Sequence, residues 1–362
     1  MTTVAVDLPG SPYAVSVGSG LLARSSDLLP EPLRRRRCGV IADTTVAALH
    51  GDAVLAGLRS SVQSAELITF PAGEGSKCMA VASALCERLA MAGIDRSGFI
   101  AALGGGVAGD LAGFVAAIHY RGIPVVQFPT TIVAQVDSSV GGKTGVNSPA
   151  GKNLIGAFHH PSAVIADTDT LATLPPREYH AGFAEIIKHA AIRSPALLER
   201  LTSDPPIDLP GLIAENVRIK ADIVAADPEE RSGLRALLNF GHTIGHAIEA
   251  AAGYGRYLHG EAISLGLVAA LRLSVAKAGL SATDAARVMR LLELHGLPTR
   301  LADDVSADGI LDLVANDKKF EEGAVRFVLL RAPGEAYVSR EVLTTEIREE
   351  IERLRLSAPE LA

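Results

Sequence analysis

Tryptophan is absent from the 362 residues, and aromatic residues together make up only 4% of the chain. The core must therefore be aliphatic and rich in alanine. Only three cysteines occur, Cys38, Cys78 and Cys86, and no two of them have the Cys-x-x-Cys spacing. The odd count and the spacing exclude a disulfide framework and a cysteine-based zinc site, and they are typical of a protein that works in the reducing cytoplasm.

Basic charge is also scarce, since 34 Lys and Arg stand against 41 Asp and Glu, a formal net charge of −7. This balance argues against broad binding to nucleic acids or to anionic membranes, because both need a basic surface. The first ten residues contain Asp7 and Pro9 and no long apolar stretch, so we expect no signal peptide. The best candidate for a membrane span, residues 99–118, is interrupted by Asp110 and three glycines, and a buried strand, a glycine turn and a helix explain it better.

Apolar residues are plentiful, at 48%, which is enough for a large core in two domains. Residues 4–8 and 13–17 predict an N-terminal hairpin. Short apolar runs then alternate with helical patterns, which predicts a mostly parallel, Rossmann-like α/β sheet. Its strands are predicted at residues 39–42, 67–70, 99–103, 125–128 and 163–166, and its helices at 77–91 and 109–120.

The pattern changes after about residue 175, where helical periodicity takes over and only a small strand pair is expected, at residues 325–330 and 336–338. We therefore expect an α/β domain over residues 1–175 and a helical domain over residues 176–362. An enzyme of this kind is expected to have its site in the cleft between the domains. The helices are predicted at residues 177–192, 212–226, 234–251, 260–278 and 282–295.

A glycine-rich turn at residues 104–110, GGGVAGD, follows a predicted strand and opens a predicted helix. Glycines let the backbone approach a pyrophosphate, and the start of a helix offers N–H groups and the positive end of the dipole. This context favours a nucleotide over a tight turn without a ligand, although a single GxGxxG match is a weak signal. No acidic residue ends the next strand, so the candidate for binding a ribose is Asp43, at the end of the strand at 39–42.

Three histidines and one glutamate after residue 180 form a candidate metal site. His242 and His246 are four residues apart, on one face of a predicted helix, and His259 stands at the start of another. Glu185 lies in an otherwise apolar helix, where a buried carboxylate needs a metal or a cation as partner. Three or four of these groups can bind Zn²⁺ with an open position for substrate, and the alternative is a set of structural core histidines. The spacing does not say which three are ligands.

Basic side chains gather beside turns and apolar segments of this acidic chain. Lys143 lies in a glycine-rich stretch, residues 140–145, that we expect to be a mobile loop, and Lys188 is one turn from Glu185. A single basic residue of this kind is more often a surface residue. Together, however, these basic side chains indicate a substrate with more than one negative charge, such as a phosphate and a carboxylate. The set is Arg121, Lys143, Lys152, Lys188, Lys220, Arg235, Lys318 and Lys319.

These motifs, in this order, resemble those of the 3-dehydroquinate synthases over most of the chain. The most specific stretch is residues 128–147, FPTTIVAQVDSSVGGKTGVN. The glycine turn precedes it, and the matching stretches that follow are 151–158 (GKNLIGAF), 181–188 (AGFAEIIK), 238–249 (LNFGHTIGHAIE), 258–261 (LHGE) and 317–319 (DKK). A chance match to all of them is not credible.

The resemblance implies a divalent metal, Zn²⁺ or Co²⁺, on Glu185, His242 and His259. His246 is then left to contact the phosphate or to transfer a proton. The resemblance further implies an NAD cofactor that contacts Asp43, Glu74, Lys77, Gly104, Gly105, Gly106, Val107, Asp110, Thr130, Thr131, Lys143, Lys152, Thr170 and Thr173. The implied substrate contacts are Asp137, Lys143, Asn153, Lys188, Lys220, Arg235, Asn239, His246 and Lys318 or Lys319, with Arg121 reaching the phosphate from the neighbouring subunit of a homodimer.

The resemblance also implies the reaction. 3-Deoxy-D-arabino-heptulosonate 7-phosphate is converted to 3-dehydroquinate and phosphate, in the shikimate pathway of aromatic amino-acid biosynthesis. The implied steps are transient oxidation by NAD⁺, elimination of phosphate, reduction, ring opening and intramolecular aldol closure, with no net redox change. The partner is thus a small phosphorylated sugar acid, and neither nucleic acid nor a membrane is expected to bind.

Three other interpretations stay open at this point. A related sugar-phosphate cyclase that acts on sedoheptulose 7-phosphate has no substrate carboxylate for Lys220 and Arg235 to hold. A metal- and NAD-dependent polyol dehydrogenase accumulates NADH during turnover. A binding module without activity has no need of a metal group beside a dinucleotide turn.

Overall fold

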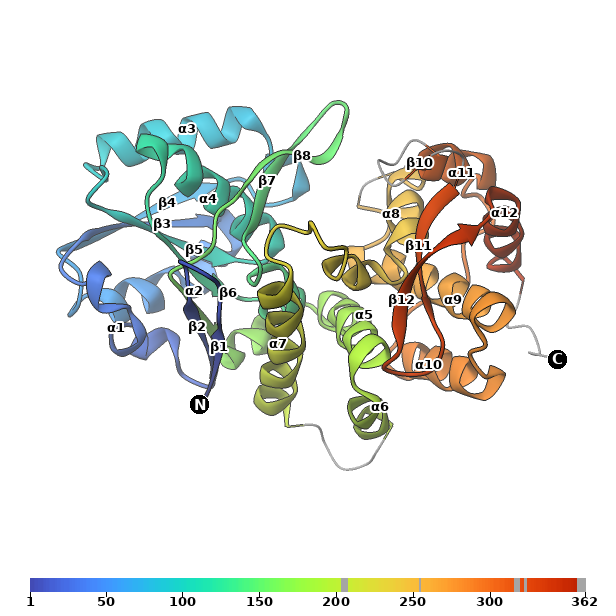
Figure 1. The fold of residues 1–362 in the computed structure, drawn as a ribbon. Helices are drawn as coiled ribbons and strands as arrows, with labels where there is room; N and C mark the ends of the chain where they lie inside the picture. Colours follow the sequence, from blue (N-terminus) through green and yellow to red (C-terminus); the bar gives the residue numbers. More distant parts are fainter. Residues whose placement is uncertain (203–207, 254, 316–319, 322–323, 357–362) are drawn as a thin grey trace. The chain divides into compact units, whose positions relative to one another are not determined.

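The computed structural model describes residues 1–202, 208–253, 255–315, 320–321 and 324–356. It divides into two compact units (Figure 1). The first unit comprises Met1–Pro175 and Asp208–Glu229, and the second comprises Pro176–Ile207 and Glu230–Ala362. Within the described residues, no helix combines the length and the apolar character that a membrane crossing requires.

A seven-stranded sheet with the order β1-β2-β9-β6-β5-β3-β4 forms the centre of the first unit. β1 pairs antiparallel with β2, and every other pair of neighbours is parallel. The strands are β1 (Thr2–Val6), β2 (Tyr13–Gly18), β3 (Arg37–Asp43), β4 (Ser64–Phe70), β5 (Phe99–Gly104), β6 (Val125–Pro129) and β9 (Ala163–Asp167). The predicted hairpin and the mostly parallel sheet are confirmed, since each predicted strand overlaps one of these elements.

Helices cover both faces of this sheet, because neighbouring residues of a strand point to opposite sides. Ile41 packs with α3 (Met79–Met91) and α4 (Gly106–Ile118), whereas Val40 packs on the other face with α2 (Thr44–Leu58). Figure 1 shows α3 and α4 on one side of the sheet and α1 and α2 on the other. Short helices complete the unit: η1 (Leu22–Arg24), α1 (Ser25–Leu28), η2 (Glu31–Leu33), η3 (Glu74–Ser76), η4 (His119–Arg121) and η6 (Thr168–Thr173).

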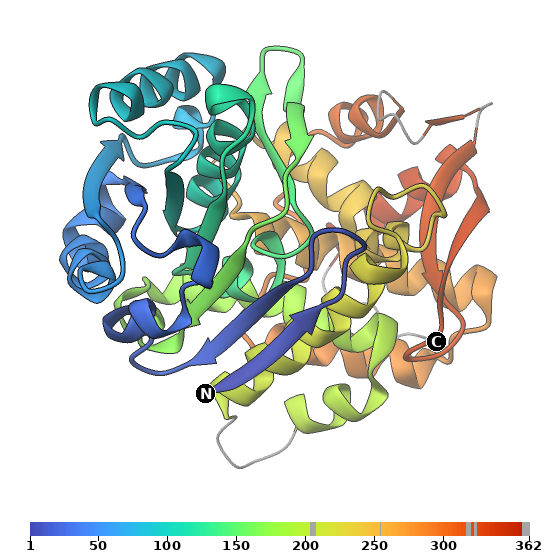
Figure 2. The same cartoon turned by 60° about the vertical axis from the view of Figure 1, so that its left-hand side comes forward.

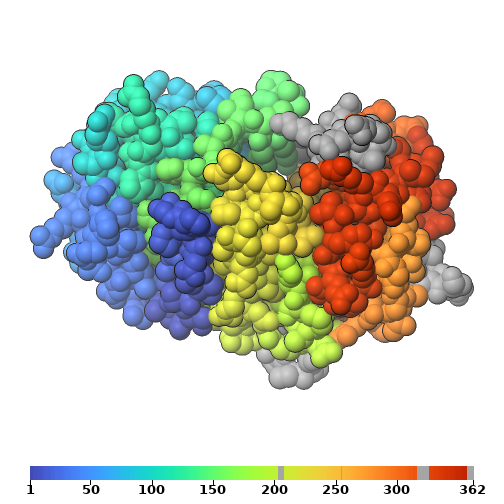
Figure 3. Space-filling model, in the orientation of Figure 1, coloured from blue at the N-terminus to red at the C-terminus, as the bar shows by residue number. Residues whose placement is uncertain are grey.

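Helix α7 (Leu209–Ala226) belongs to the first unit, although the sequence places it after the expected boundary at residue 175. It packs against β1, β2 and the π-helical turn η5 (Ala134–Ser138). Figures 1 and 2 show α7 beside the N-terminal hairpin, and Figure 3 shows that the hairpin reaches the surface. Hydrophobic periodicity predicts this helix, but periodicity does not identify the apolar surface on which the helix packs.

The expected loop at residues 140–145 is wrong for its second half, because only residues 140–142 lie outside helices and strands. Lys143 begins β7 (Lys143–Ser148), which pairs antiparallel with β8 (Gly151–Phe158). Thr144 and Val146 are buried, and β7 packs against α4. The buried residues 144–146 therefore anchor a segment whose glycines suggested flexibility.

The second unit is helical and carries one small antiparallel sheet, β10-β11-β12. The predicted helical part and its strand pair are confirmed. The predicted helix over 234–251 is instead two helices, because Gly241 has a φ of 78°, which a right-handed helix does not contain. The elements are α5 (Pro176–Arg193), α6 (Pro195–Leu201), η7 (Arg235–Asn239), α8 (His242–Ala251), α9 (His259–Ala278), α10 (Ala282–Leu294), α11 (Ala307–Ala315), β10 (Phe320–Glu321), β11 (Ala324–Leu330), β12 (Ala336–Val342) and α12 (Thr344–Arg353).

Candidate active site

Half of the predicted cofactor contacts follow the carboxyl ends of parallel strands in the first unit. The carboxyl ends of neighbouring parallel strands meet at one edge of a sheet, and open α/β sheets bind their ligands there. The residues at this edge are Asp43 on β3, Glu74 after β4, Gly104 on β5, Thr130 and Thr131 after β6, and Thr170 and Thr173 after β9.

The turn from β5 into α4 depends on glycine. Gly104 has a φ of 148°, which residues with a side chain rarely adopt, and a Cβ there would lie 2.6 Å from Cβ of Ala108. Gly105 is the N-cap of α4, and no side chain caps the N–H groups of the first turn, which includes Gly106 and Val107. These N–H groups can bind an anion, because the start of a helix lacks intrahelical partners for them.

Lys77 joins the start of α4 to the hairpin β7–β8. Its Nζ lies 2.5 Å from Oδ2 of Asp110 and donates a hydrogen bond of 2.6 Å to Oδ1 of Asn153. Burial raises the pKa of the Asp110 carboxyl, and the neighbouring Lys77 opposes this increase. The resemblance assigns Lys77 and Asp110 to NAD and Asn153 to the substrate phosphate, and the structure brings the three into one polar cluster.

Asn147 extends this cluster, and sequence reasoning missed it. Its Oδ1 accepts from the N–H of Asn153 at 3.0 Å, and its Nδ2 donates to Oε1 of Glu74 at 2.7 Å. Nζ of Lys152 lies 3.6 Å from the same Glu74 oxygen. Asn147 is uncharged and is the last residue of the recognised stretch 128–147, so only its contacts reveal that it links the predicted residues.

Another ionic pair in the first unit joins Asp137, on η5, to Lys220, on α7. Nζ of Lys220 lies 2.7 Å from Oδ1 of Asp137 and also donates to its backbone oxygen at 2.6 Å. The Lys220 side chain is buried. Asp137 lies in a π-helical turn, and such turns are frequent at functional sites.

In the second unit, three helices bring Glu185, His242 and His259 together. Glu185, on α5, is fully buried. Its Oε1 lies 3.3 Å from Nε2 of His242 and 3.4 Å from Nε2 of His259. Two tetrahedral ligands at about 2.0–2.1 Å from one ion lie about 3.3 Å apart. Both distances from Oε1 of Glu185 therefore match the spacing of two ligands on one metal ion.

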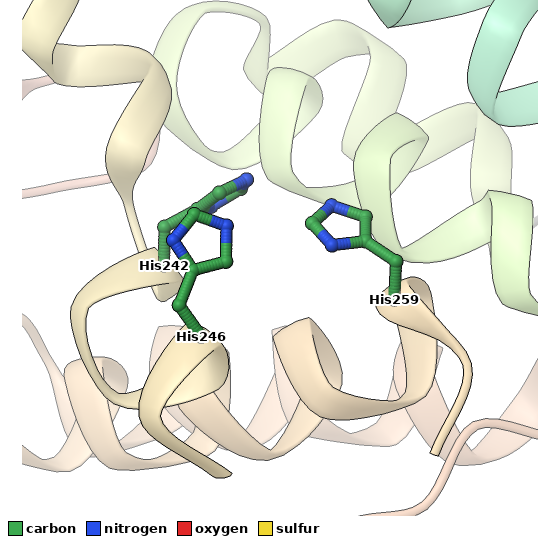
Figure 4. A group of neighbouring side chains, drawn as sticks. All are labelled: His242, His246 and His259. Carbon is green, nitrogen blue, oxygen red and sulfur yellow. The ribbon is translucent and has the colours of Figure 1, made fainter. Parts of the chain in front are cut away.

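His246 lies beside the same group. One ring nitrogen from each of His242, His246 and His259 lies within 4.8 Å of the others. Figure 4 shows the rings of His242 and His246, one turn apart on α8, and the ring of His259, at the start of α9, around a common space. His242 and His259 thus belong to two overlapping sets of three donors, one completed by Glu185 and one by His246.

The electrostatics of Glu185 and His242 favour their metal-binding forms. Burial by itself raises the pKa of the Glu185 carboxyl, but Lys188, which contacts Oε2, and His242 hold that pKa well below its usual range. Burial and Lys188 lower the pKa of His242 to about 4. Glu185 is therefore anionic and His242 neutral at pH 7, and both states offer a lone pair to a metal. For His259, burial by itself lowers the pKa, but the hydrogen bonds to Glu185 and Glu249 raise it to about 9, so a metal ion must displace a proton from this ring.

The remaining predicted residues lie on several elements. Arg235 and Asn239 are the first and last residues of η7, just before α8, and Arg235 is buried. Arg121, at the end of η4, and Lys143 are exposed. Lys318 and Lys319 lie outside the described residues.

Two family models match the chain in succession. The model described as 3-dehydroquinate synthase N-terminal covers residues 67–181, and the model described as 3-dehydroquinate synthase C-terminal covers residues 182–320. The chain belongs to the 3-dehydroquinate synthase family. A 3-dehydroquinate synthase of Symbiobacterium thermophilum is 46% identical over 356 residues, which cover 95% of this chain and 98% of that protein.

Solved structures of related cyclases have the same fold. A 2-deoxy-scyllo-inosose synthase in complex with carbaglucose-6-phosphate, NAD⁺ and Co²⁺ superposes with a TM-score of 0.86 at 26% identity, over 97% of this chain and all of that one. The 2-epi-5-epi-valiolone synthase of Streptomyces hygroscopicus, with NAD⁺ and Zn²⁺ bound, gives 0.85 at 28% identity, over 96% of this chain and 98% of that one.

Proposed function

We propose that this chain is a 3-dehydroquinate synthase, which converts 3-deoxy-D-arabino-heptulosonate 7-phosphate to 3-dehydroquinate and phosphate. The observation that carries the proposal is the shared Glu185 oxygen, at 3.3 and 3.4 Å from two histidine nitrogens, in a chain of this family. Identity of 46% to a 3-dehydroquinate synthase, against 26–28% to the two other cyclases, favours this substrate over sedoheptulose 7-phosphate.

Glu185, His242 and His259 would hold a divalent ion, Zn²⁺ or Co²⁺. The donor set fits, because one carboxylate and two imidazoles lie at ligand spacing and leave a position for substrate. The two related cyclases contain Co²⁺ and Zn²⁺. Such an ion would lower the pKa of the substrate hydroxyl that is oxidised. Lys188 holds the second oxygen of Glu185 and so fixes the carboxylate in one orientation.

The sheet edge of the first unit would bind NAD, which accepts a hydride and returns it later. The N–H groups at the start of α4 would bind the pyrophosphate, and Asp43 would accept from a ribose hydroxyl. Asp43 already accepts from the N–H groups of Thr45 and Val46, so its orientation is fixed. The other proposed contacts are Glu74, Lys77, Gly104, Gly105, Gly106, Val107, Asp110, Thr130, Thr131, Lys143, Lys152, Thr170 and Thr173.

Basic and amide side chains would bind the two anionic groups of the substrate. In the first unit, Lys220 would bind the carboxylate or a hydroxyl while Asp137 keeps its ammonium oriented, and the phosphate contacts would be Lys143 and Asn153. In the second unit, the substrate contacts would be Lys188, Arg235, Asn239, His246 and Lys318 or Lys319. Many fixed donors suit a substrate that must stay in place through several steps.

His246 would assist the loss of phosphate. It lies beside the proposed ligands but at the exposed side of the group, so its ring can contact a phosphate oxygen or exchange a proton with it. Elimination removes a proton next to the new ketone and releases the phosphate, and the phosphate oxygen itself can take that proton.

The enzyme would act as a homodimer in the cytoplasm. β8 exposes apolar side chains, since Leu154 is 44% and Phe158 is 50% exposed, and such a patch on an edge strand fits a second copy of the chain. Arg121 would then reach the phosphate of the neighbouring subunit. Three cysteines without the spacing of a disulfide framework are typical of a cytoplasmic enzyme.

One assay tests the proposed function. Purified protein with Zn²⁺, catalytic NAD⁺ and 3-deoxy-D-arabino-heptulosonate 7-phosphate should release phosphate without a steady rise of NADH absorbance. Turnover of sedoheptulose 7-phosphate instead would select the related cyclase. Continuous accumulation of NADH would select a polyol dehydrogenase.

Lys143→Ala should mainly weaken substrate capture. The side chain is exposed at the start of β7, so its loss should leave the fold intact and remove one charged contact to the phosphate. We expect kcat/KM to fall about tenfold or more, mostly through KM, because a charged hydrogen bond is worth about 1.5–3 kcal/mol. Steady-state kinetics beside Lys277→Ala, a lysine paired with Glu346, measure this effect. Kinetics equal to those of the control would remove Lys143 from the phosphate site.

Asn147→Ala should weaken NAD⁺ binding. The substitution removes the hydrogen bonds from Asn147 to Glu74 and to the backbone N–H of Asn153. Glu74 and Asn153, which bonds to Lys77, are then no longer held in place by a shared partner. Two bonds of about 1 kcal/mol predict an increase of about fivefold to thirtyfold in the Kd for NAD⁺. Isothermal titration calorimetry measures it, with Ser148→Ala, at the next residue, as the control. An unchanged Kd would show that Asn147 does not organise the cofactor contacts.

A further inference from the structure

Glu249 lies behind the proposed metal ligands, on α8, three residues after His246. Its side chain is buried, and its Oε2 lies 3.6 Å from Nδ1 of His259. The other ring nitrogen of His259, Nε2, faces Oε1 of Glu185 at 3.4 Å. The imidazole of His259 therefore has a carboxylate on each side.

His242 shows the same arrangement with a different partner. Its Nδ1 lies 3.1 Å from the backbone oxygen of Phe240, and a carbonyl oxygen can only accept. Nδ1 of His242 therefore carries a proton, and Nε2 lies 3.3 Å from Oε1 of Glu185, where its lone pair would bind an ion held between the two atoms. Each ring thus has an acceptor next to Nδ1 and directs Nε2 to the same carboxylate oxygen.

We propose that Glu249 is a positioning residue for the metal: it keeps the proton of His259 on Nδ1, so that Nε2 can bind the ion. This inference rests on the metal site of the proposed function. A carboxylate behind a ligating histidine fixes the tautomer and the orientation of the ring and increases the basicity of the ligating nitrogen. For His242 a neutral carbonyl has this role, so Glu249 adds a negative charge that the other histidine lacks.

The proposed role also explains why α8 has a carboxylate at residue 249. The helix is otherwise apolar or small after His246, with Ala247, Ile248, Ala250 and Ala251. A carboxylate buried there is costly without a polar partner, and the imidazole of His259 is one.

The test is the affinity for Zn²⁺, measured by competition with a chelating dye in the full-length protein. Glu249→Ala should raise the Kd for Zn²⁺ by about 10- to 100-fold, which is usual when the partner of a ligating histidine is lost. Glu249→Gln keeps an acceptor oxygen but loses the charge, so its Kd should lie between those of Glu249→Ala and the unchanged protein. The Co²⁺-loaded Glu249→Ala protein should also show a changed visible absorption spectrum, because the orientation of one ligand changes.

Glu350→Gln is the matched control. Glu350 is also a buried glutamate of the second unit, on α12, and its partners Arg272 and Arg353 are at 3.8 and 2.8 Å. This substitution should lower the melting temperature and leave the Zn²⁺ affinity and the Co²⁺ spectrum unchanged. Glu249 variants with a Kd for Zn²⁺ within about twofold of the unchanged protein would overturn the inference, whatever their melting temperature. Failure of the unchanged protein to bind Zn²⁺ would instead overturn the metal site itself.

Discussion

His242→Ala is expected to lose the bound metal and the activity together. Nε2 of His242 is one of the three atoms at ligand spacing, and alanine offers no replacement. Of the proposed ligand set only Glu185 and His259 remain, which are too few for a site that keeps one position open for substrate, and the proposed role of His246 is to contact the phosphate. A metal that stabilises a developing charge contributes several kcal/mol, and about 4 kcal/mol corresponds to a loss of about 1,000-fold in rate. Zinc content by atomic absorption and phosphate release measure the two losses.

His295→Ala is the control for this prediction. His295 stacks on Phe183 of α5, with ring centroids 4.3 Å apart, so it contacts the helix that carries Glu185 but is outside the histidine group. Its substitution should disturb local packing and retain zinc and most of the activity. One zinc ion per chain in purified His242→Ala protein would show that the ligand choice is wrong.

The sequence predicts the parallel sheet because β3, β5, β6 and β9 are short apolar runs, and burial on both faces leaves this pattern. It does not predict the β7–β8 hairpin. There burial does not alternate along the strand, because Thr144, Gly145 and Val146 are all buried, and glycines surround the segment. Likewise, the periodicity of residues 209–226 predicts α7 but not its place in the first unit, which depends on contacts with β1 and β2.

The sequence predicts those parts of the candidate site that depend on residues close together in the chain. The spacing of His242 and His246 is that of one helical turn, and a glutamate in an apolar helix requires a partner, so both predict the metal group. Asn147 and Glu249 are not predicted to act, because their importance lies in contacts to residues distant in the sequence, such as Glu74 for Asn147 and His259 for Glu249. No spacing rule encodes such contacts.

Gly260→Ala is expected to destabilise the second unit and to separate the metal ligands. A Cβ at residue 260 would lie 1.9 Å from the backbone oxygen of Ala181, so α5 and α9 touch backbone to backbone at this point. Glu185 lies one turn after Ala181, and His259 directly precedes Gly260. The helix contact therefore sets the distance of 3.4 Å between Oε1 of Glu185 and Nε2 of His259. A backbone oxygen within a helix cannot rotate away as a side chain can, so the helices must move apart.

The expected cost of this substitution is at the upper end of overpacking effects, about 3 kcal/mol, with a fall of roughly 6–12 °C in melting temperature. Because the ligand spacing widens at the same time, the Kd for Zn²⁺ should rise by more than about tenfold. Gly309→Ala, on α11, is the matched control, since its Cβ would meet only Ser306 at the ordinary contact distance of 3.5 Å. It should keep both properties or gain slightly in stability, because alanine is the better helix former. If Gly260→Ala melts early but binds Zn²⁺ as tightly as the control, the contact between α5 and α9 stabilises the fold without setting the ligand spacing.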